Sequence, residues 1–460
     1  MVRMYLLKTL LYILVMAGLS SPTYAWEGDR GSLNWYWNTE IGSHTDGVSA
    51  LMKLYNSLQI KGSYTCNKNI SLFINIKKFY DSVYDISGEY RSGSHRIATN
   101  TGNTWLREFF IDVERRPFFA RIGRQQVVWG SSDGVRALDC INPGDGRYAY
   151  LDDASEYRIP LWMARLEASP VPDATLQLLL IPDYEPSISA GNGDVFVFRP
   201  TDLAAERLAG LPSFIRIVEK NKTPLNDFRN GSYALRWQQV ISGWEYTLNY
   251  KYGYEAYPQG AGIFSIRDRG KPTLTLTKDY TKRINIFGAS FTKAVTAGTL
   301  SGLTVRGEFL YTRGKPYPYG SNGQVVGNTD ISEYTYMLGL DKIFFTDVLT
   351  SAQLIQFIHS RSRYNGNDLF FLATFAPLHR VETMVTFRIA TDFFAERLKP
   401  ELLMIYDERS DWRISPKVSY EVNNNLWIYA GLHLFYGKEH SLFGQFSDDN
   451  MIYAGQTLSF

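Results

Sequence analysis

The sequence predicts an all-β fold, a transmembrane antiparallel β-barrel of the outer-membrane type. Three observations support it: an N-terminal export signal, strands that alternate apolar and polar side chains, and connections that alternate between short and long. We expect roughly 18 strands, with 16 as the alternative, short periplasmic turns and long extracellular loops. Residues 26–460 then form a single outer-membrane β-barrel domain.

Residues 1–25 predict a signal peptide. Arg3 and Lys8 supply positive charge, an apolar run of about ten residues follows, and Thr23-Tyr24-Ala25 ends in small residues at the spacing for cleavage. The run is short for a stable membrane span, although an N-terminal anchor is the alternative. We therefore expect export to the outer membrane of a Gram-negative bacterium.

Composition and the chain end agree with this class. The chain has 31 Tyr, 27 Phe and 10 Trp, residues that collect at the two interfaces of membrane barrels. Its formal net charge is only +2, so we expect no nucleic-acid partner. Residues 450–460 form a candidate strand that closes on Phe460, an ending common in outer-membrane barrels.

Strand alternation is clearest in residues 244–254, where Trp244, Tyr246 and Leu248 share one face and Glu245 and Thr247 the other. A β-sandwich would alternate in the same way. Segments of about nine to twelve residues, the reach needed to cross a bilayer at a tilt, favour the barrel. The same alternation recurs in residues 233–238, 303–311 and 381–389.

Connections between these strands fall into two classes. We expect short turns near residues 114–117, 169–173, 241–243 and 422–425. We expect long loops at residues 81–103, 128–158, 182–231, 255–281, 314–331, 361–379 and 437–449. Loops 128–158 and 182–231 could fold into the lumen. Residues 201–220 predict a short amphipathic helix, either in the lumen or on the barrel mouth.

Motifs for catalysis are absent from the sequence. None of the six histidines forms a His-x-x-x-His pair, and no Cys/His spacing suits a metal. The glycine-rich stretch Gly123 to Gly134 lacks the Lys-Ser/Thr ending of a phosphate loop. We expect no enzyme activity, no cofactor and no metal site. A barrel enzyme that draws its residues from separate strands is the less favoured alternative.

Residues 105–126 predict a hairpin that turns at Arg115-Arg116. With Glu114 opposite Pro117, Glu108 and Arg121 become diagonal neighbours on the lumen face, close enough for an ion pair. Arg124 falls on the lipid face at its outer end, where its side chain can reach the headgroups.

Polar residues on inner faces and in loop 128–158 are the candidates for a lumen lining or constriction. They carry both signs of charge, which argues against strong anion or cation selectivity. The alternative is that they are solvated, or pair with one another to hold the wall. These candidates are Glu108, Asp112, Arg121, Gln125, Asp133, Arg136, Asp139, Arg236, Glu245, Arg306, Glu308 and Arg388.

Several stretches carry a family resemblance. Residues 106–113, 121–145 and 151–167 resemble a family of proteobacterial outer-membrane proteins classed only as a domain of unknown function; "GRQQVVWG" at 123–130 is the most recognisable run. Residues 283–291, 303–314 and 442–460 are also similar. The resemblance implies an outer-membrane barrel without assigned substrate or binding residues. A looser similarity, through Arg121 to Gln125, is to alginate-export and other porin-like channels.

Cys140 departs from the aliphatic residue usual in that family. Two cysteines in an oxidising compartment could form one disulfide, Cys66 to Cys140, which would pin the loop inward; two unpaired thiols are the alternative.

The favoured function is an outer-membrane channel, porin-like, that passes small or amphipathic solutes and could be coupled to a periplasmic or inner-membrane transport partner. A barrel of 16 to 18 strands is wide enough to enclose an aqueous lumen unless loops fill it. The alternative is a non-conducting structural, assembly or binding component. In either case outer-membrane lipids surround the wall.

Overall fold

A computed structural model describes residues 26–46, 51–87, 90, 105–149, 151–199, 216–256, 259–268, 271–321, 324–371, 374 and 376–460. The predicted signal peptide, residues 1–25, lies outside these ranges. No helix within the described ranges is long and apolar enough to cross a membrane.

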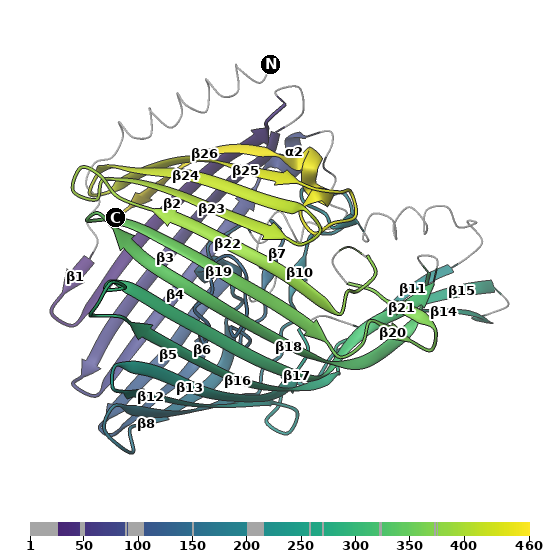
Figure 1. Ribbon diagram of the computed structural model, residues 1–460, viewed down its shortest axis with the longest axis horizontal. Coiled ribbons are helices and arrows are strands. Elements are labelled where there is room, and N and C mark those ends of the chain that lie inside the picture. The colour runs from purple at the N-terminus through teal and green to yellow at the C-terminus, as the bar shows by residue number, and fades with distance from the viewer. Residues whose placement is uncertain are drawn as a thin grey trace.

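The main sheet closes into an antiparallel barrel of 18 strands, which confirms the predicted fold class and strand number (Figure 1). The first and last wall strands, β2 and β26, pair from Tyr36–Ser459 to His44–Met451 and so remove both sheet edges. In order around the wall, the strands are β2 (Gly31–His44), β3 (Leu51–Asn67), β4 (Ile70–Asp81), β5 (Leu106–Arg115), β6 (Phe118–Gln125), β8 (Leu161–Ala168), β9 (Ala174–Ile181), β12 (Ser232–Ile241), β13 (Trp244–Tyr254), β16 (Arg283–Ala294), β17 (Leu303–Ser321), β18 (Gln324–Phe344), β19 (Val348–His359), β22 (Val381–Ala390), β23 (Leu398–Asp407), β24 (Asp411–Asn423), β25 (Leu426–Tyr436) and β26 (Met451–Ser459).

The structure also contains smaller strands and helices outside the 18 wall strands. Three short strands extend the main sheet: β1 (Trp26–Gly28), β20 (Arg363–Tyr364) and β21 (Asn367–Leu369). Two separate sheets pair β7 (Asp145–Gly146) with β10 (Ile188–Ser189), and β15 (Lys271–Asp279) with both β11 (Arg216–Lys222) and β14 (Gln259–Asp268). The short helices are α2 (Val83–Ile86), α3 (Ala154–Tyr157) and η2 (Gly444–Asp449).

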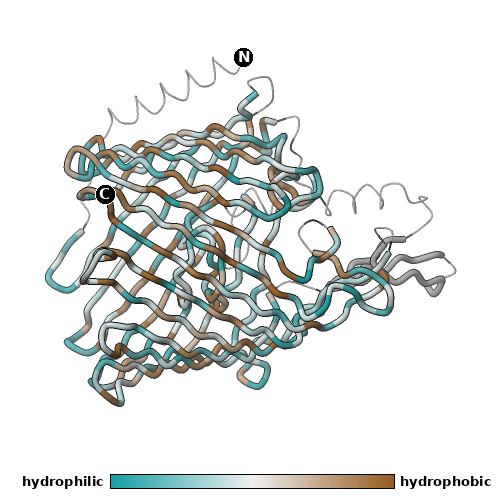
Figure 2. Tube along the Cα trace, in the orientation of Figure 1, coloured by the Kyte–Doolittle hydropathy of each residue, from teal (hydrophilic) through white to brown (hydrophobic). Residues whose placement is uncertain are grey.

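Side-chain alternation explains why these segments form a wall. In β13 the exposed fraction of Leu248 is 63%, whereas Thr247 and Asn249 on the opposite face are buried. The same contrast holds in β22, where Val385 is exposed and Thr386 buried. Apolar and polar residues alternate along the strands in Figure 2. An outward apolar face and an inward polar face are the arrangement of a barrel that stands in lipid.

Most connections follow the expected asymmetry. At the end where β2 begins and β26 ends, β5 and β6 are joined through residues 116–117, and β12 and β13 through residues 242–243. Long connections join β6 to β8 and β9 to β12 at the other end.

Two expectations about loops are wrong. Residues 314–331 are not a loop, because β17 and β18 continue to Ser321 and from Gln324. The positive φ of Gly314 (82°) lies at a register shift between Thr312 and Lys315, so glycine and proline mark a bulge there rather than the end of pairing. Residues 216–220 of the expected helix belong to strand β11, which pairs with β15; residues 200–215 lie outside the described residues.

The register of the β5–β6 hairpin also differs from the expected one. Asp112 pairs with Arg121 and Glu114 with Phe119, a shift of two residues relative to the prediction. The turn is centred on Arg116-Pro117 because proline, which has no N–H to donate, occupies the turn rather than the ladder. Since side chains alternate with a period of two, the inward and outward faces are unchanged.

Candidate functional site

Residues 126–149 and 151–160, which we call the inner segment, lie inside the barrel. Arg107 of β5 donates to the carbonyl oxygens of Ser155, Glu156 and Arg158, at 2.9, 3.1 and 2.8 Å. Five strands further round the wall, the Lys251 Nζ of β13 donates to the carbonyl oxygen of Cys140 at 2.6 Å. The segment is thus tied to widely separated strands of the wall.

Glu308 of β17 is the deepest of these anchors, with 4% of its surface exposed. Its carboxylate accepts hydrogen bonds from the backbone N–H and the hydroxyl of Ser131, the latter at 2.9 Å, and from the backbone N–H of Leu138 at 2.8 Å. Hydrogen bonds to a charged acceptor are stronger than neutral ones. One wall carboxylate therefore fixes two points of the inner segment.

Asp133 forms a second anchor. Its Oδ2 accepts hydrogen bonds from Arg306 Nη2 and Ser351 Oγ, both at 3.0 Å, and from the Gln353 amide, while Arg388 Nη1 lies 3.9 Å from Oδ1. Arg306 also pairs with Asp341 at 2.6 Å. The structure therefore gathers four predicted residues, Asp133, Arg306, Glu308 and Arg388, where the inner segment meets β17, β19 and β22.

Arg136 and Asp139 stabilise the segment internally. Asp139 pairs with Arg136 at 3.2 Å and with Arg158 at 2.7 Å. Cys140 beside them packs against the buried cluster that contains Leu138, and burial raises the pKa of its thiol. Cys140 and Cys66 are both free thiols, so the inward position of the segment does not depend on a disulfide.

The remaining predicted residues lie in the wall. Arg121 pairs with Asp112 at 2.7 Å rather than with Glu108, which accepts from the backbone N–H of Gln126 at 3.2 Å. The expected Glu108–Arg121 contact is therefore wrong, because the hairpin register brings Asp112 directly opposite. Gln125 is buried and donates to the carbonyl oxygen of Met163 at 3.2 Å.

Arg124 was expected to reach lipid headgroups, and this is wrong. Only 1% of its surface is exposed. Its guanidinium pairs with Glu185 at 2.6 Å, lies 3.8 Å from Asp183, and donates to the carbonyl oxygen of Leu106. The acidic residues that follow β9 cover it.

A small cavity of about 290 Å³ lies beneath Val127 and Val128, against β8, β9 and β12. Arg236 lines it and donates to the carbonyl oxygen of Val128 at 3.3 Å. Glu245 lies on β13 and accepts from Gln238 at 2.9 Å, a residue that also lines the cavity.

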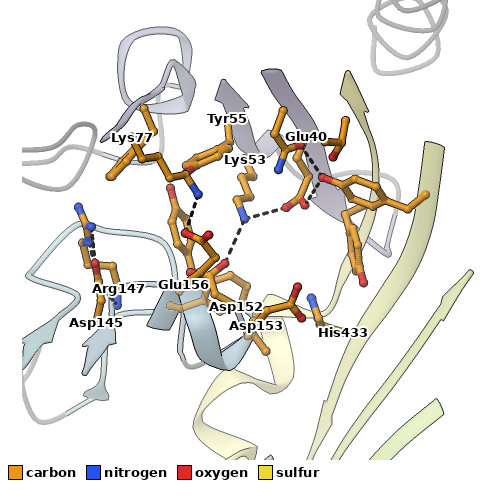
Figure 3. Close-up of a pocket in the computed structure, with 18 of the residues that line it drawn as sticks. Glu40, Lys53, Tyr55, Lys77, Asp145, Arg147, Asp152, Asp153, Glu156 and His433 are labelled. Carbon is orange, nitrogen blue, oxygen red and sulfur yellow. Dashed lines mark hydrogen bonds and ion pairs between the residues drawn. The ribbon is translucent and has the colours of Figure 1, made fainter. Parts of the chain in front are cut away.

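A cavity of about 420 Å³ separates the inner segment from the wall formed by β2, β3, β4, β24, β25 and β26 (Figure 3). Such a volume is in the range of sites that hold small organic molecules. None of the twelve predicted residues lines it. Several of them, among them Asp133, Arg306 and Glu308, fix the inner segment in place, and the cavity lies on the other side of that segment.

Charged residues line this cavity from both sides. Lys53 pairs with Glu40 at 2.7 Å and lies 4.0 Å from Asp152. Lys77 pairs with Glu156 of α3 at 2.8 Å. Burial alone would raise the pKa of the Glu156 carboxyl, but the positive charges of Lys77, Arg107 and Lys61 together outweigh burial and hold that pKa below its ordinary value.

Aromatic rings lie among these charges. The Lys53 ammonium stands 4.2 Å from the centre of the Tyr148 ring, whose hydroxyl donates to Asp81 at 2.7 Å. Tyr429 donates a hydrogen bond to Glu40 at 3.0 Å. Phe196, in the connection between β9 and β12, also lines the cavity. Phe196 and Tyr148 belong to one buried cluster, so part of that long connection also lies inside the barrel.

The sequence carries a partial signal for this lining. In β3, Lys53 and Tyr55 have the same parity as Ser57 and Gln59, the pattern of an inward polar face. That pattern marks an inner face but does not show which inner face borders open space.

Within the described part of the chain, no group of three or more His, Cys, Asp or Glu side chains is placed to hold a metal ion.

Known structures share this architecture at low sequence identity. A BenF-like porin from Pseudomonas fluorescens Pf-5 is 8% identical, with a TM-score of 0.51 and coverage of 94% of this chain and 98% of that chain. For Pseudomonas aeruginosa OccK8 (OprE) the identity is 9%, the TM-score 0.49 and the coverage 94% and 97%. The first similarity supports a porin-like fold alone.

No curated protein matches the sequence significantly. The family described as "Protein of unknown function (DUF1302)" matches residues 12–367, well over half of the chain. This match agrees with the family resemblance of the sequence and with the observed barrel. The chain belongs to this family of proteins of unknown function.

Proposed function

We propose that this protein is an outer-membrane channel that passes small or amphipathic solutes through the space between the inner segment and the barrel wall. The observation that carries the proposal is the 420 Å³ cavity inside an 18-strand barrel, lined by charged and aromatic side chains on both sides. A barrel of this size encloses a lumen wide enough for solutes unless it is filled. Here the inner segment narrows the lumen without occupying all of it.

The lining suits polar solutes that carry an apolar part. Lys53, Lys77 and Glu40 offer charge-assisted hydrogen bonds, and Tyr55 and Trp427 offer flat apolar faces. Because both signs of charge are present, we expect weak selectivity between simple anions and cations. Coupling to a periplasmic or inner-membrane partner stays a prediction from the sequence.

Ion flow through the purified protein in planar bilayers tests the proposal. We expect stepwise conductance, and a changed conductance when Lys53 and Lys77 are both replaced by glutamine, because these ammonium groups border the gap. Arg116→Gln is the matched control, since that side chain is 94% exposed in a turn far from the cavity lining. Absence of any conductance, both in the intact protein and after removal of residues 131–157, would refute the channel.

A further inference from the structure

The charged residues that line the 420 Å³ cavity differ in sign between the barrel wall and the inner segment. The wall contributes five cations and one anion, and the inner segment contributes four anions and one cation. The wall residues are Lys53, Lys77, Arg107, Arg124, Lys417 and Glu40; those of the inner segment are Asp145, Asp152, Asp153, Glu156 and Arg147. The gap therefore has a positive side and a negative side.

Many of these charges already have a partner. Lys53 pairs with Glu40, Lys77 with Glu156, and Arg124 with Glu185 outside the lining. Arg147 donates to its neighbour Asp145 at 2.7 Å. Ion pairs of this kind fix the lining and leave little net charge for a solute to meet.

Arg107 has no ion pair among the described residues but is held by backbone carbonyl oxygens; two further charged positions have no such partner. Lys417 of β24 lies 5.3 Å from the centre of the Tyr429 ring and forms no ion pair with another described residue. Asp153, on the inner segment, likewise has no ion pair within the described part of the chain, and Asp152 beside it lies no closer than 4.0 Å to Lys53. Asp153 and Asp152 are both exposed to the cavity. An unpaired cation on the wall thus shares the cavity with two weakly paired carboxylates on the inner segment.

From this arrangement we propose that the cavity binds small dipolar solutes, zwitterions of the amino-acid type that carry an ammonium and a carboxylate. The ammonium would face Asp152 and Asp153, and the carboxylate would face Lys417. A simple anion is attracted by one side and repelled by the other, whereas a dipolar solute aligned across the gap gains at both ends. The methylene part of such a solute would lie on the rings of Tyr429 and Trp427.

This inference rests on the proposed channel, but binding and passage can be measured separately. Calorimetric titration of the detergent-purified protein gives binding, and swelling of liposomes that contain it gives passage. The probes are ω-amino acids from β-alanine to 6-aminohexanoate, with hexanoate, hexylammonium and hexanamide as anionic, cationic and neutral counterparts. We expect a zwitterion to bind more tightly than each counterpart, by about two- to fivefold for each charge contact in a solvated cavity.

Variants identify the groups. Lys417→Gln should remove the preference for the zwitterion over hexylammonium, and Asp152→Asn with Asp153→Asn should remove the preference over hexanoate. Asp347→Asn, in the exposed turn between β18 and β19, is the control and should retain both preferences. The inference would be overturned if the unchanged protein bound 6-aminohexanoate, hexanoate, hexylammonium and hexanamide equally, or if the variants kept both preferences. Conductance through the same protein would still support the channel in that case. Binding of the zwitterion without passage of any probe would support the site and refute the channel.

Discussion

Replacement of Glu308 by glutamine should release the inner segment from the wall. The carboxylate of Glu308 accepts from two backbone amides, of Ser131 and Leu138, and from the Ser131 hydroxyl, while 4% exposed. A glutamine retains one acceptor oxygen and turns the other into a donor, so one amide loses its partner. The lost charge-assisted bond is worth about 1.5–3 kcal/mol, and the stranded buried donor costs about 1–3 kcal/mol more.

The sum, about 2.5–6 kcal/mol, raises the population of the released segment by about 50-fold or more, since 1.4 kcal/mol is a factor of ten. Single-channel recordings should show larger or fluctuating conductance levels, and limited proteolysis should cut the segment sooner. Glu245→Gln is the matched control, because that inward carboxylate contacts the Gln238 side chain and not the inner segment. Conductance and cleavage equal to those of the unchanged protein would refute the assigned role of Glu308.

Three further outcomes are expected. Lys77 is the first of the neighbouring cations, with Arg107 and Lys61, that hold the pKa of Glu156 below its ordinary value against burial. The Lys77–Glu156 ion pair therefore stabilises the folded state at neutral pH and is lost only as pH falls through that lowered pKa. In Lys77→Met, conductance should begin to change at higher pH, and an identical pH profile would contradict the contact. Gly123→Ala should destabilise the barrel by at least about 1–3 kcal/mol in urea unfolding, since its φ is 142° and a Cβ would lie 2.1 Å from a backbone carbonyl oxygen. A maleimide should label Cys66 before Cys140, which is partly buried against the Leu138 cluster and has a thiol pKa raised by desolvation. Equal labelling rates would contradict that raised pKa.

The period of two along each strand made the inner and outer faces predictable. Asp112 and Arg121 point inward even though the register differs from expectation by two residues, because an even shift preserves the faces. The partner of Arg121 could not be obtained in this way, since it depends on which residues form the turn.

The cavity lining could not be predicted because it depends on contacts between distant parts of the chain. Glu40, Lys53 and Lys77 look like any inward polar residues of a strand. They become a lining only because Asp152 and Glu156, some 80 to 110 residues later in the chain, are held opposite them. Arg107 holds that part of the inner segment through hydrogen bonds to backbone carbonyl oxygens, which no side-chain pattern reveals.

The seam between β2 and β26 restricts the order in which the molecule can assemble. It joins the first and last wall strands, so the wall cannot become a closed ring until the final residues of the chain are in place. The inner segment touches both sides of that seam, through Lys53 of β3 and through a buried cluster that includes Tyr148 and Tyr453 of β26. The inner segment thus meets the wall on both sides of the joint that closes it. Its contacts with β3 and β26 can therefore exist together only once the first and last wall strands lie side by side.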